Sequence, residues 1–169
     1  MDMDSLVPKP YITADYASHN GMNGDNINDI YVDGGDRIWL ANYPAGVTIR
    51  NNRYQSYEWF RHSPGNSRSL VNDQVHDVIE DSEGDLWFAT SNGISLLQPA
   101  VGRWRSFLSR SDGIQDGGNH IFLTLCEVSP GVICAGGYAS GLYRIERKPG
   151  GGILSPLLCS RGASRPVYQ

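Results

Sequence analysis

A ten-residue segment, DGGDRIWLAN at residues 33–42, returns in altered form as DSEGDLWFAT at residues 81–90. The two tryptophans, Trp39 and Trp87, are 48 residues apart (87 minus 39). The same offset joins three more pairs of identical residues, which are Asp29 and Asp77, Asp33 and Asp81, and Ala41 and Ala89. A fixed period of this length is typical of folds that stack one structural unit several times. The period therefore limits the possible folds of this chain more than any other feature.

A third, more divergent copy follows the second. Ile121 corresponds to Val75 at an offset of 46 (121 minus 75) and Cys134 to Trp87 at an offset of 47 (134 minus 87), so one residue has been inserted between these two positions. The insertion falls at residues 128–131, where the earlier copies have their turns with Asp and Gly. We therefore expect three repeats between about residues 27 and 147.

Each repeat carries four short segments rich in β-branched and aromatic residues, separated by turns that contain Gly, Pro or Asp. We expect strands at residues 27–32, 37–42, 46–50 and 55–61, at 75–80, 86–90, 94–97 and 103–108, and at 121–127, 132–136, 142–146 and 153–158. Four antiparallel strands in each repeat of 46 to 48 residues are the pattern of a β-propeller blade. The predicted fold is all-β, an incomplete propeller of about three four-stranded blades preceded by one N-terminal strand.

The repeats also divide the chain into five segments. These are residues 1–24, with the outermost strand of a preceding blade at 11–16, blade repeats at 25–72, 73–118 and 119–158, and an irregular tail at 159–169. Closed propellers have four to eight blades, so we expect the remaining blades to belong to a longer parent protein. Unfinished sheets expose strand edges and apolar faces. We therefore expect this fragment to associate with copies of itself, for example as a ring of two chains.

Composition excludes several classes of protein. The net charge is -4, and the 14 Lys and Arg residues form no basic run, which argues against binding to nucleic acid. No run of 18 apolar residues is present, so direct insertion into a membrane is not expected, and the N-terminus does not resemble a secretory signal. No motif for a cofactor or a metal is present.

The three cysteines, Cys126, Cys134 and Cys159, match no zinc-binding spacing. Cys126 and Cys134 flank a turn, so they could face each other across a hairpin. The alternative, which we favour at this stage, is that they are two small buried thiols.

The second repeat resembles the regulator-propeller repeat, N-x-I-x-x-I-x-x-D-x-x-G-x-x-W-x-x-T-x-x-G-L. The residues that carry this resemblance are Asp73, Gln74, Val75, Val78, Asp81, Gly84, Trp87, Thr90, Gly93 and Ile94. The resemblance extends over about residues 25–145. It is weaker in the first repeat, where Gly35 is shifted by one position, and weakest in the third, where Cys134 replaces Trp and Glu127 stands near the Asp position.

The segment WLANYPAGV, at residues 39–47, is similar to the variant in the extracytoplasmic sensor domains of hybrid two-component histidine kinases. That resemblance implies a periplasmic receptor module for breakdown products of complex glycans. It also implies a parent protein with a membrane span, a kinase and a receiver, none of which lies in these residues. The fragment itself is then expected not to be an enzyme.

The repeated aspartates could indicate catalysis, because sialidases carry a similar Asp-x-x-Gly-x-x-Trp box. We instead expect Asp33 and Asp81 to fix their turns by bonding to backbone amides, with Trp39 and Trp87 filling the space between sheets. Residues repeated at one turn of successive blades do not converge on one point, as catalysis requires. No catalytic residue is therefore predicted.

Asp29 and Asp77 fall on the predicted innermost strands. They could line a central channel, but we favour hydrogen bonds to the adjacent blade. The histidines at 19, 62, 76 and 120 show no metal-binding spacing and are expected to be surface or loop residues.

In a propeller, the connections between blades and those between second and third strands open on one side. The candidate ligand-binding residues on these loops are Asn42, Tyr43, His62, Asn66, Arg68, Asn92 and Tyr138. Aromatic rings beside fixed donors and acceptors suit sugars, so an oligosaccharide is the expected ligand. Two alternatives remain open, a propeller enzyme of the lyase or glycosidase type and a protein-interaction propeller without a small ligand.

Overall fold

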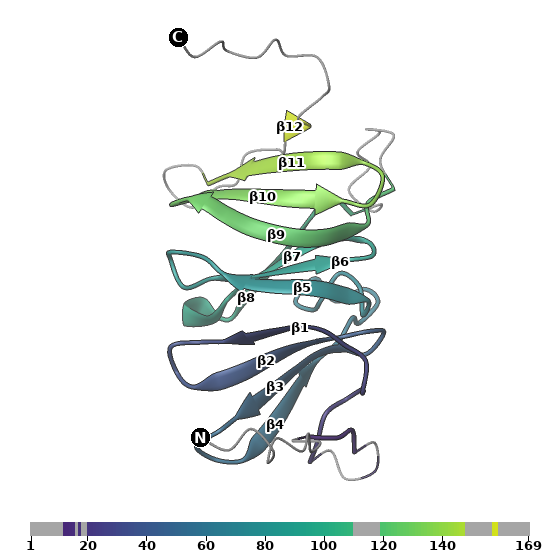
Figure 1. Cartoon of the computed structure of the whole chain (residues 1–169), viewed down its shortest axis with the longest axis vertical. Helices are drawn as coiled ribbons and strands as arrows, with labels where there is room; N and C mark the ends of the chain where they lie inside the picture. Colours follow the sequence, from purple (N-terminus) through teal and green to yellow (C-terminus); the bar gives the residue numbers. More distant parts are fainter. Residues whose placement is uncertain (1–11, 16, 18–19, 110–118, 148–156, 159–169) are drawn as a thin grey trace, which may run out of the picture.

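A computed structural model describes residues 12–15, 17, 20–109, 119–147 and 157–158 of the chain. It contains three four-stranded antiparallel sheets, each formed by four strands that follow one another in the sequence (Figure 1). These are β-propeller blades, as predicted. None of the described residues forms a helix with the length and apolar character that a membrane crossing requires.

The first blade consists of β1 (Ile27–Val32), β2 (Arg37–Asn42), β3 (Gly46–Asn51) and β4 (Ser56–Phe60). The second consists of β5 (Val75–Glu80), β6 (Leu86–Thr90), β7 (Gly93–Gln98) and β8 (Arg103–Phe107), with a 3-10 turn, η2 (Pro99–Val101), before β8. The third consists of β9 (Phe122–Ser129), β10 (Val132–Gly137), β11 (Gly141–Glu146) and β12 (Leu157–Leu158).

The predicted strands are confirmed with small differences at their ends. β1, β2, β5 and β6 have the predicted bounds, and the other strands of the first two blades and β9 to β11 differ by one or two residues. In the last predicted strand, residues 153–156 lie outside the described residues. The N-terminal segment differs more. Residues 12–15 contain one isolated bridge, from Ala14 to Met22, instead of a strand.

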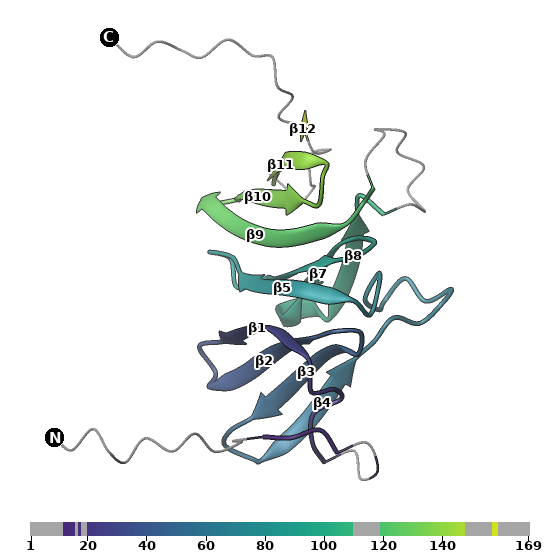
Figure 2. The same ribbon diagram turned by 45° about the vertical axis from the view of Figure 1, so that its right-hand side comes forward.

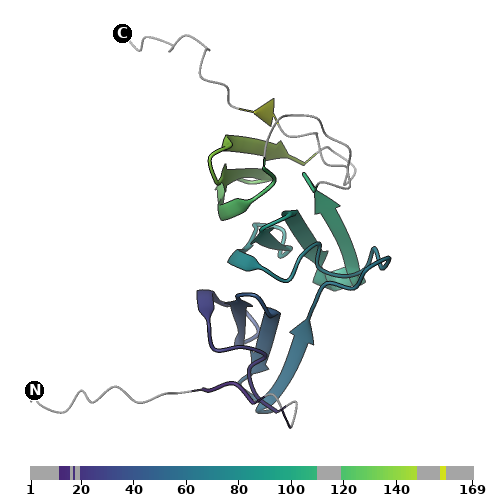
Figure 3. The same cartoon turned by 90° about the vertical axis from the view of Figure 1, so that its right-hand side faces the viewer.

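The three blades fan out from one side of the molecule. The first strands of the blades, β1, β5 and β9, lie next to one another on that side, and the outer strands β4 and β8 lie on the opposite side (Figure 3). The connection between β4 and β5 projects from the stack (Figure 2). We call the interface between the first and second blades the first seam, and that between the second and third blades the second seam.

Each seam is filled by the tryptophan of the preceding blade, as predicted. Trp39 is 1% exposed and packs in the first seam with Val75, Val78 and Phe88 of the second blade. Trp87 is fully buried and packs in the second seam. Its neighbours there from the third blade include Phe122, Leu125, Ile133 and Ala135. Burying a large aromatic side chain in this way is a major source of stability.

The repeated aspartates fix their turns, also as predicted. One carboxylate oxygen of Asp33 accepts hydrogen bonds from the backbone amides of Gly35 (2.9 Å) and Arg37 (3.0 Å). The other accepts the indole N–H of Trp39 at 2.9 Å, a contact that the sequence analysis did not anticipate. Burial alone would raise the pKa of Asp33, but the hydrogen bonds from Trp39 and Arg37 outweigh it and lower the pKa.

Asp81 repeats this arrangement in the second blade. It accepts the amides of Glu83 (2.9 Å) and Asp85 (3.0 Å) and the indole N–H of Trp87 (2.6 Å). The Asp, the turn and the Trp therefore form one unit. This unit explains why the residues recur together in the sequence.

The aspartates of the innermost strands bond to the next blade, as we favoured. Asp29 accepts the backbone amide of Val78 at 3.0 Å, and Asp77 accepts that of Leu125 at 2.6 Å. Burial raises the pKa of Asp77, the bond from Leu125 opposes this rise, and the nearby Asp29 adds to it. Each of these carboxylates therefore joins two blades.

The glycines that begin the third strands are required by close packing. Gly46 has φ +79, and a Cβ there would lie 2.3 Å from the carbonyl oxygen of Phe60. At Gly93, with φ +102, the corresponding distance to the Phe107 oxygen is 2.6 Å. A side chain at either position would collide with the backbone of the neighbouring strand.

The third blade keeps the register of the others despite its divergent sequence. Cys134 lies directly opposite Cys126, in the place where Trp39 lies opposite Tyr31 and Trp87 opposite Ile79. The expectation of two buried thiols was wrong, because Cys126 is exposed and Cys134 is only half-buried. Among the described residues, no further blade covers this face of the sheet.

Candidate functional site

The turns after β2, β6 and β10 each lie at the end of their blade where the chain enters the first strand, whereas residues 110–118, between β8 and β9, lie outside the described residues. Backbone amides of the turns after β2, β6 and β10 bond to the segments that lead into the first strands of the blades. These bonds join Tyr43 to Asn26 (2.9 Å), Ser91 to Gln74 (3.0 Å) and Tyr138 to Ile121 (2.8 Å). We call this end of the blades, formed by residues 43–45, 61–74, 91–92, 119–121 and 138–140, the loop face.

A polar cluster crosses the first seam at the loop face. The Tyr43 ring lies 5.6 Å from the ring of His76, and the side-chain amide of Gln74 donates to the Tyr43 hydroxyl at 3.2 Å. The Nε2 atom of His76 lies 2.8 Å from the hydroxyl oxygen of Ser91. Burial lowers the pKa of His76, so the neutral imidazole is favoured. Tyr43 is held in place by both neighbours.

The histidines differ from the expectation that they are surface or loop residues. His62 is an exposed loop residue, as predicted. His76 lies in β5 and is half-buried, so the prediction was wrong for it. His120 precedes β9 and is a loop residue, as predicted, but it is buried, with a ring nitrogen 2.8 Å from the Leu108 carbonyl oxygen. His19 lies outside the described residues.

The connection between β4 and β5 carries three of the predicted ligand-binding residues. His62, Asn66 and Arg68 are all exposed on it. A ring nitrogen of His62 lies 2.8 Å from the carbonyl oxygen of Leu70, and the Asn66 side chain accepts the amide of Arg68 at 2.9 Å. These contacts give the loop a defined shape.

Two adjacent hollows lie between this connection and β8. The larger has a volume of about 550 Å³ and is lined by Ser67, Arg68, Val101, Gly102, Arg103, Trp104, Arg105 and Ser106. The smaller, of about 370 Å³, includes His62, Asn66, Ser67 and Ser106 in its lining. We call the larger one the arginine hollow. Three of its eight lining residues are arginines, and none of the eight is acidic.

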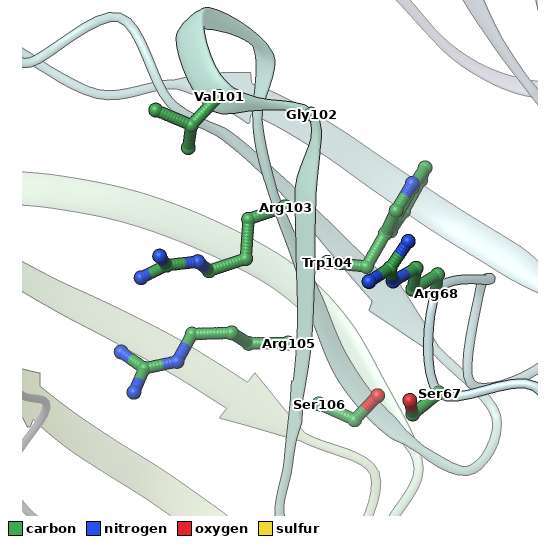
Figure 4. Close-up of a pocket in the computed structure, with 8 residues that line it drawn as sticks. All are labelled: Ser67, Arg68, Val101, Gly102, Arg103, Trp104, Arg105 and Ser106. Atoms are coloured by element: carbon green, nitrogen blue, oxygen red, sulfur yellow. The ribbon is translucent and has the colours of Figure 1, made fainter.

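The arrangement of the arginine hollow is seen in Figure 4. Arg103 and Arg105 extend to one side of β8, whereas Trp104 and Arg68 lie on the other, and the hydroxyls of Ser67 and Ser106 lie close together. Alternation along a strand explains why Arg103 and Arg105 share a side. The Trp104 ring is fixed from behind by Phe60 and Phe88, at centroid distances of 5.2 and 5.8 Å.

The remaining predicted ligand-binding residues lie elsewhere. Tyr138 is 57% exposed on the third blade, and Asn92 is half-buried beside the second seam. Asn42 is a correction, because it is fully buried and its amide donates to the carbonyl oxygen of Gly24 at 3.0 Å. It holds the segment before β1 and is not available on the surface. The predicted residues thus do not form one common site.

Sequence reasoning missed the part of the site that β8 supplies. Arg103, Trp104, Arg105 and Ser106 were recognised only as an outer strand. The alternation of arginine with tryptophan was visible in the sequence, but its position beside residues 61–72 depends on the fold. In the part of the chain that the structure describes, no three His, Cys, Asp or Glu side chains meet as metal ligands.

Comparison with known proteins supports the repeat assignment. The sequence model described as "Two component regulator propeller" matches residues 69–92. These residues include the end of the β4–β5 connection and the Asp81 and Trp87 unit of the second blade. No curated protein matches the chain.

Several solved structures have a similar fold. The extracellular domain assigned to a hybrid two component system from B. thetaiotaomicron has a TM-score of 0.69 and 23% sequence identity, over 80% of this chain and 19% of that one. Two further structures, both of one other extracellular domain from B. thetaiotaomicron, are similar. One, assigned to a one component system, has a TM-score of 0.58 and 22% identity, over 84% of this chain and 17% of that one.

The other, assigned to a hybrid two component system, has a TM-score of 0.61 and 21% identity, over 90% of this chain and 19% of that one. The chain therefore spans about a fifth of the length of the solved domains it resembles. Residues 69–92 thus match a two-component regulator propeller repeat, and the fold around them is similar to that of the extracellular domains of two-component systems.

Proposed function

We propose that this chain is a ligand-binding part of the extracytoplasmic sensor region of a hybrid two-component histidine kinase, located in the periplasm. The observation that carries the proposal is the arginine hollow, which combines a fixed aromatic ring with cationic and hydroxyl groups beside the loop face. The match to the regulator propeller and the similarity to extracellular domains support the assignment to a receptor. The ligand is an oligosaccharide released from a complex glycan.

The composition of the hollow favours an acidic sugar over a neutral one. A sugar ring has an apolar face that packs on an aromatic ring such as Trp104 and an edge of hydroxyls that suits Ser67 and Ser106. A guanidinium group forms paired hydrogen bonds with a carboxylate. Arg68 is exposed on the same side of β8 as Trp104 and can offer such bonds. An oligosaccharide that contains uronic acid satisfies both requirements.

We propose binding without chemical conversion. Glycosidases use a pair of carboxyl groups on either side of the scissile bond, and none of the eight residues that line the arginine hollow carries one. The carboxylates of Asp33 and Asp81 bond to their turns and to indole N–H groups instead. The module therefore acts by binding, and the kinase of the parent protein supplies the enzymatic activity.

Titration with an oligogalacturonide, followed by calorimetry, tests this proposal. We expect Arg68→Ala to weaken binding about tenfold or more, because one charge-assisted hydrogen bond contributes about 1.5–3 kcal/mol. Arg53→Ala is the matched control, since Arg53 is equally an exposed loop arginine but lies in the turn between β3 and β4. A neutral oligosaccharide of the same length should bind more weakly than the acidic one.

Two results would contradict the proposal. One is equal weakening by Arg53→Ala and Arg68→Ala, which would indicate unspecific attraction of the ligand by positive charge. The other is cleavage of the oligosaccharide by the purified chain, seen by chromatography after incubation. Tyr138→Ala tests whether the third blade takes part in binding. Tyr54→Ala is its control, because the Tyr54 side chain is also exposed.

A second proposal concerns protein contact at the open face of the first blade. Ile30 is 61% exposed there, whereas Val78 and Leu125, at the corresponding positions of the other blades, are 2% and 5% exposed. Beside Ile30 is an apolar hollow of about 320 Å³, which includes Met22, Ile38 and Leu40 in its lining. We propose that a second copy of this chain covers this face.

Light scattering tests the self-association. We expect a dimer at tens of micromolar, and a monomer for Ile30→Glu, because the substitution places a charge in the apolar contact. Val101→Glu is the control, since Val101 is similarly exposed (65%) but lies at η2. A monomeric mass for the unaltered chain would contradict this proposal and would leave the one about the ligand unaffected.

A further inference from the structure

The third blade has two cysteines at a position where the other blades have large side chains. Cys126 of β9 and Cys134 of β10 are directly opposite each other. The corresponding pairs are Tyr31 with Trp39 in the first blade and Ile79 with Trp87 in the second. In those blades the Trp fills a seam. In the third blade the same place holds two thiols.

The separation of the two residues suits a covalent bond. Directly opposite residues of antiparallel strands have Cα atoms about 4.5–5.5 Å apart, and their side chains share one face of the sheet. A disulfide joins Cα atoms about 4.4–6.8 Å apart. The backbone of β9 and β10 therefore does not have to move for a bond to form between the two sulfurs.

The face that carries the two thiols is open to solvent. Cys126 is exposed and Cys134 is half-buried. Leu142, which pairs with Gly136 two residues after Cys134, is 46% exposed. The innermost strand also has Thr124 at the position where Asp29 and Asp77 bond to a following blade. This face thus lacks the groups that join the other blades to each other.

We propose that Cys126 and Cys134 form a cross-strand disulfide that ties β9 to β10. The oxidant is a small-molecule disulfide such as glutathione disulfide. The thiolate of exposed Cys126 attacks one sulfur of the oxidant, which forms a mixed disulfide and releases one glutathione thiolate. The thiolate of Cys134 then attacks the Cys126 sulfur, so the protein disulfide forms and the second glutathione thiolate leaves. Two protein thiols are oxidised, one oxidant disulfide is reduced, and the two thiol protons pass to the two glutathiones.

The bond would stabilise the third blade on its uncovered side. It closes a short hairpin between the innermost strand and its neighbour, where the other blades rely on packing against a Trp. A cross-link of this size raises the melting temperature by restricting the unfolded chain. We expect the oxidised chain to melt on the order of 5 °C above the reduced chain.

Peptide mapping of the full chain tests the proposal directly. The chain is equilibrated with excess glutathione disulfide, its free thiols are alkylated, and the denatured protein is cut after glutamate. Cleavage after Glu127 separates Cys126 from Cys134, so the expected result is two peptides that stay joined until a reductant is added. Cys159 should be joined to no other protein cysteine and should carry either glutathione or the alkyl group. Because the unaltered chain is used, this measurement does not depend on the folding of a variant.

Serine variants supply the matched controls. Cys159→Ser should keep the linked peptides and the difference in melting temperature between oxidised and reduced chain. Cys134→Ser should lose both. The proposal is overturned if Cys126 and Cys134 each carry glutathione or the alkyl group after equilibration with the oxidant. It is equally overturned if either cysteine is found joined to Cys159 in place of the other.

Discussion

The two seams join similar blades with different balances of aromatic packing and charge. In the first seam, Trp39, Phe60, Phe88 and Trp104 form a continuous aromatic group, with neighbouring centroids 5.2 to 6.2 Å apart. In the second seam, the aromatic rings form two separate pairs, Trp87 with Phe107 at 6.0 Å and Phe122 with Tyr143 at 5.1 Å, each within one blade. The continuous aromatic group of the first seam is thus divided in the second, where aliphatic residues complete the core.

At each seam an arginine bonds to the aspartate of the Asp–Trp unit. At the first seam this arginine belongs to the same blade as the aspartate, and at the second seam it belongs to the following blade. Arg37 bonds to Asp33 at 2.7 Å and lies 5.4 Å from the Trp39 ring centroid, within the first blade. At the second seam, Arg147 of the third blade bonds to Asp81 and to Asp85 (2.7 Å) and lies 5.8 Å from the Trp87 ring centroid.

A single position explains this difference. Residue 37 corresponds to residue 85 in the repeat (85 minus 37 is 48), and the first is Arg whereas the second is Asp. A second carboxylate beside Asp81 has to be neutralised from elsewhere, and Arg147 does this across the seam. Burial alone would lower the pKa of Arg147, but its bonds to Asp85 and Asp81 outweigh burial and raise the pKa. The Asp–Trp unit of the second blade is therefore neutralised across a seam, whereas that of the first blade is neutralised within its own blade.

The largest expected effect is the loss of a seam tryptophan. Trp39→Ala and Trp87→Ala should each lower the free energy of unfolding by about 3–5 kcal/mol, because each removes a buried aromatic side chain. Urea denaturation measures the change, and Tyr54→Ala, at a side chain that is 72% exposed, should leave it almost unaltered. If Trp87→Ala has no effect while Trp39→Ala does, packing does not hold the second seam.

Substitution of the two arginines should show a larger difference between the seams than substitution of the two tryptophans. Arg147→Ala leaves Asp81 and Asp85 buried without their cation and should cost about 3 kcal/mol. Arg37→Ala should cost about 1 kcal/mol or less, since the side chain of Arg37 is 41% exposed and that of Arg147 only 10%. Denaturation of both variants gives the comparison.

A rescue experiment controls this prediction. Asp85→Arg places an arginine at the position that Arg37 has in the first blade, so it should restore much of the stability lost in Arg147→Ala. Equal losses for Arg37→Ala and Arg147→Ala would show that the second seam does not depend on charge across it.

The smallest expected effects are those of pH, and they have opposite signs at the two seams. The pKa of Asp33 is lowered in the folded chain from an ordinary value of 3.8, so its contribution to stability is present above 3.8 and is lost as pH falls through the folded pKa. The pKa of Asp77 is raised, so the free energy of unfolding falls as pH rises from 3.8 through its folded pKa.

Unfolding measured from pH 3 to 7 checks both signs. The difference in stability between the unaltered chain and Asp33→Asn should shrink toward low pH. The free energy of unfolding of Asp77→Asn should increase relative to that of the unaltered chain as pH rises. Parallel pH profiles for the two variants would mean that the environments of these carboxylates are not opposite.

The strands and the seam tryptophans could be predicted because each is encoded locally and repeated. Alternation of apolar and polar residues predicts a strand, and Asp with Gly predicts a turn. The offset of 48 allows each assignment to be compared with a second copy. Arg147 could not be found in this way, since its partners Asp81 and Asp85 are 66 and 62 positions away and no copy of the contact exists in the first blade.

The candidate site was predicted less well for the same reason. Arg68 was identified from its loop, but the arginine hollow also needs β8, which approaches that loop only in the folded chain. Asn42 was placed on the surface because a polar residue at a strand end usually belongs to a loop. It is buried because the carbonyl oxygen of Gly24 requires a donor. Cys126 was expected inside because small thiols usually are, but that expectation assumes a covering blade.

The aspartates of the innermost strands give the stack a direction. Asp29 and Asp77 each accept an amide from the blade that follows, and no blade returns the same bond to the one before it in the described residues. Such head-to-tail contacts can continue for as long as each added unit brings both a donor and an acceptor, as the second blade does. Duplication of one unit within a gene therefore lengthens the array without the need for a new interface. The number of units can then change in evolution while the chemistry of each junction stays the same.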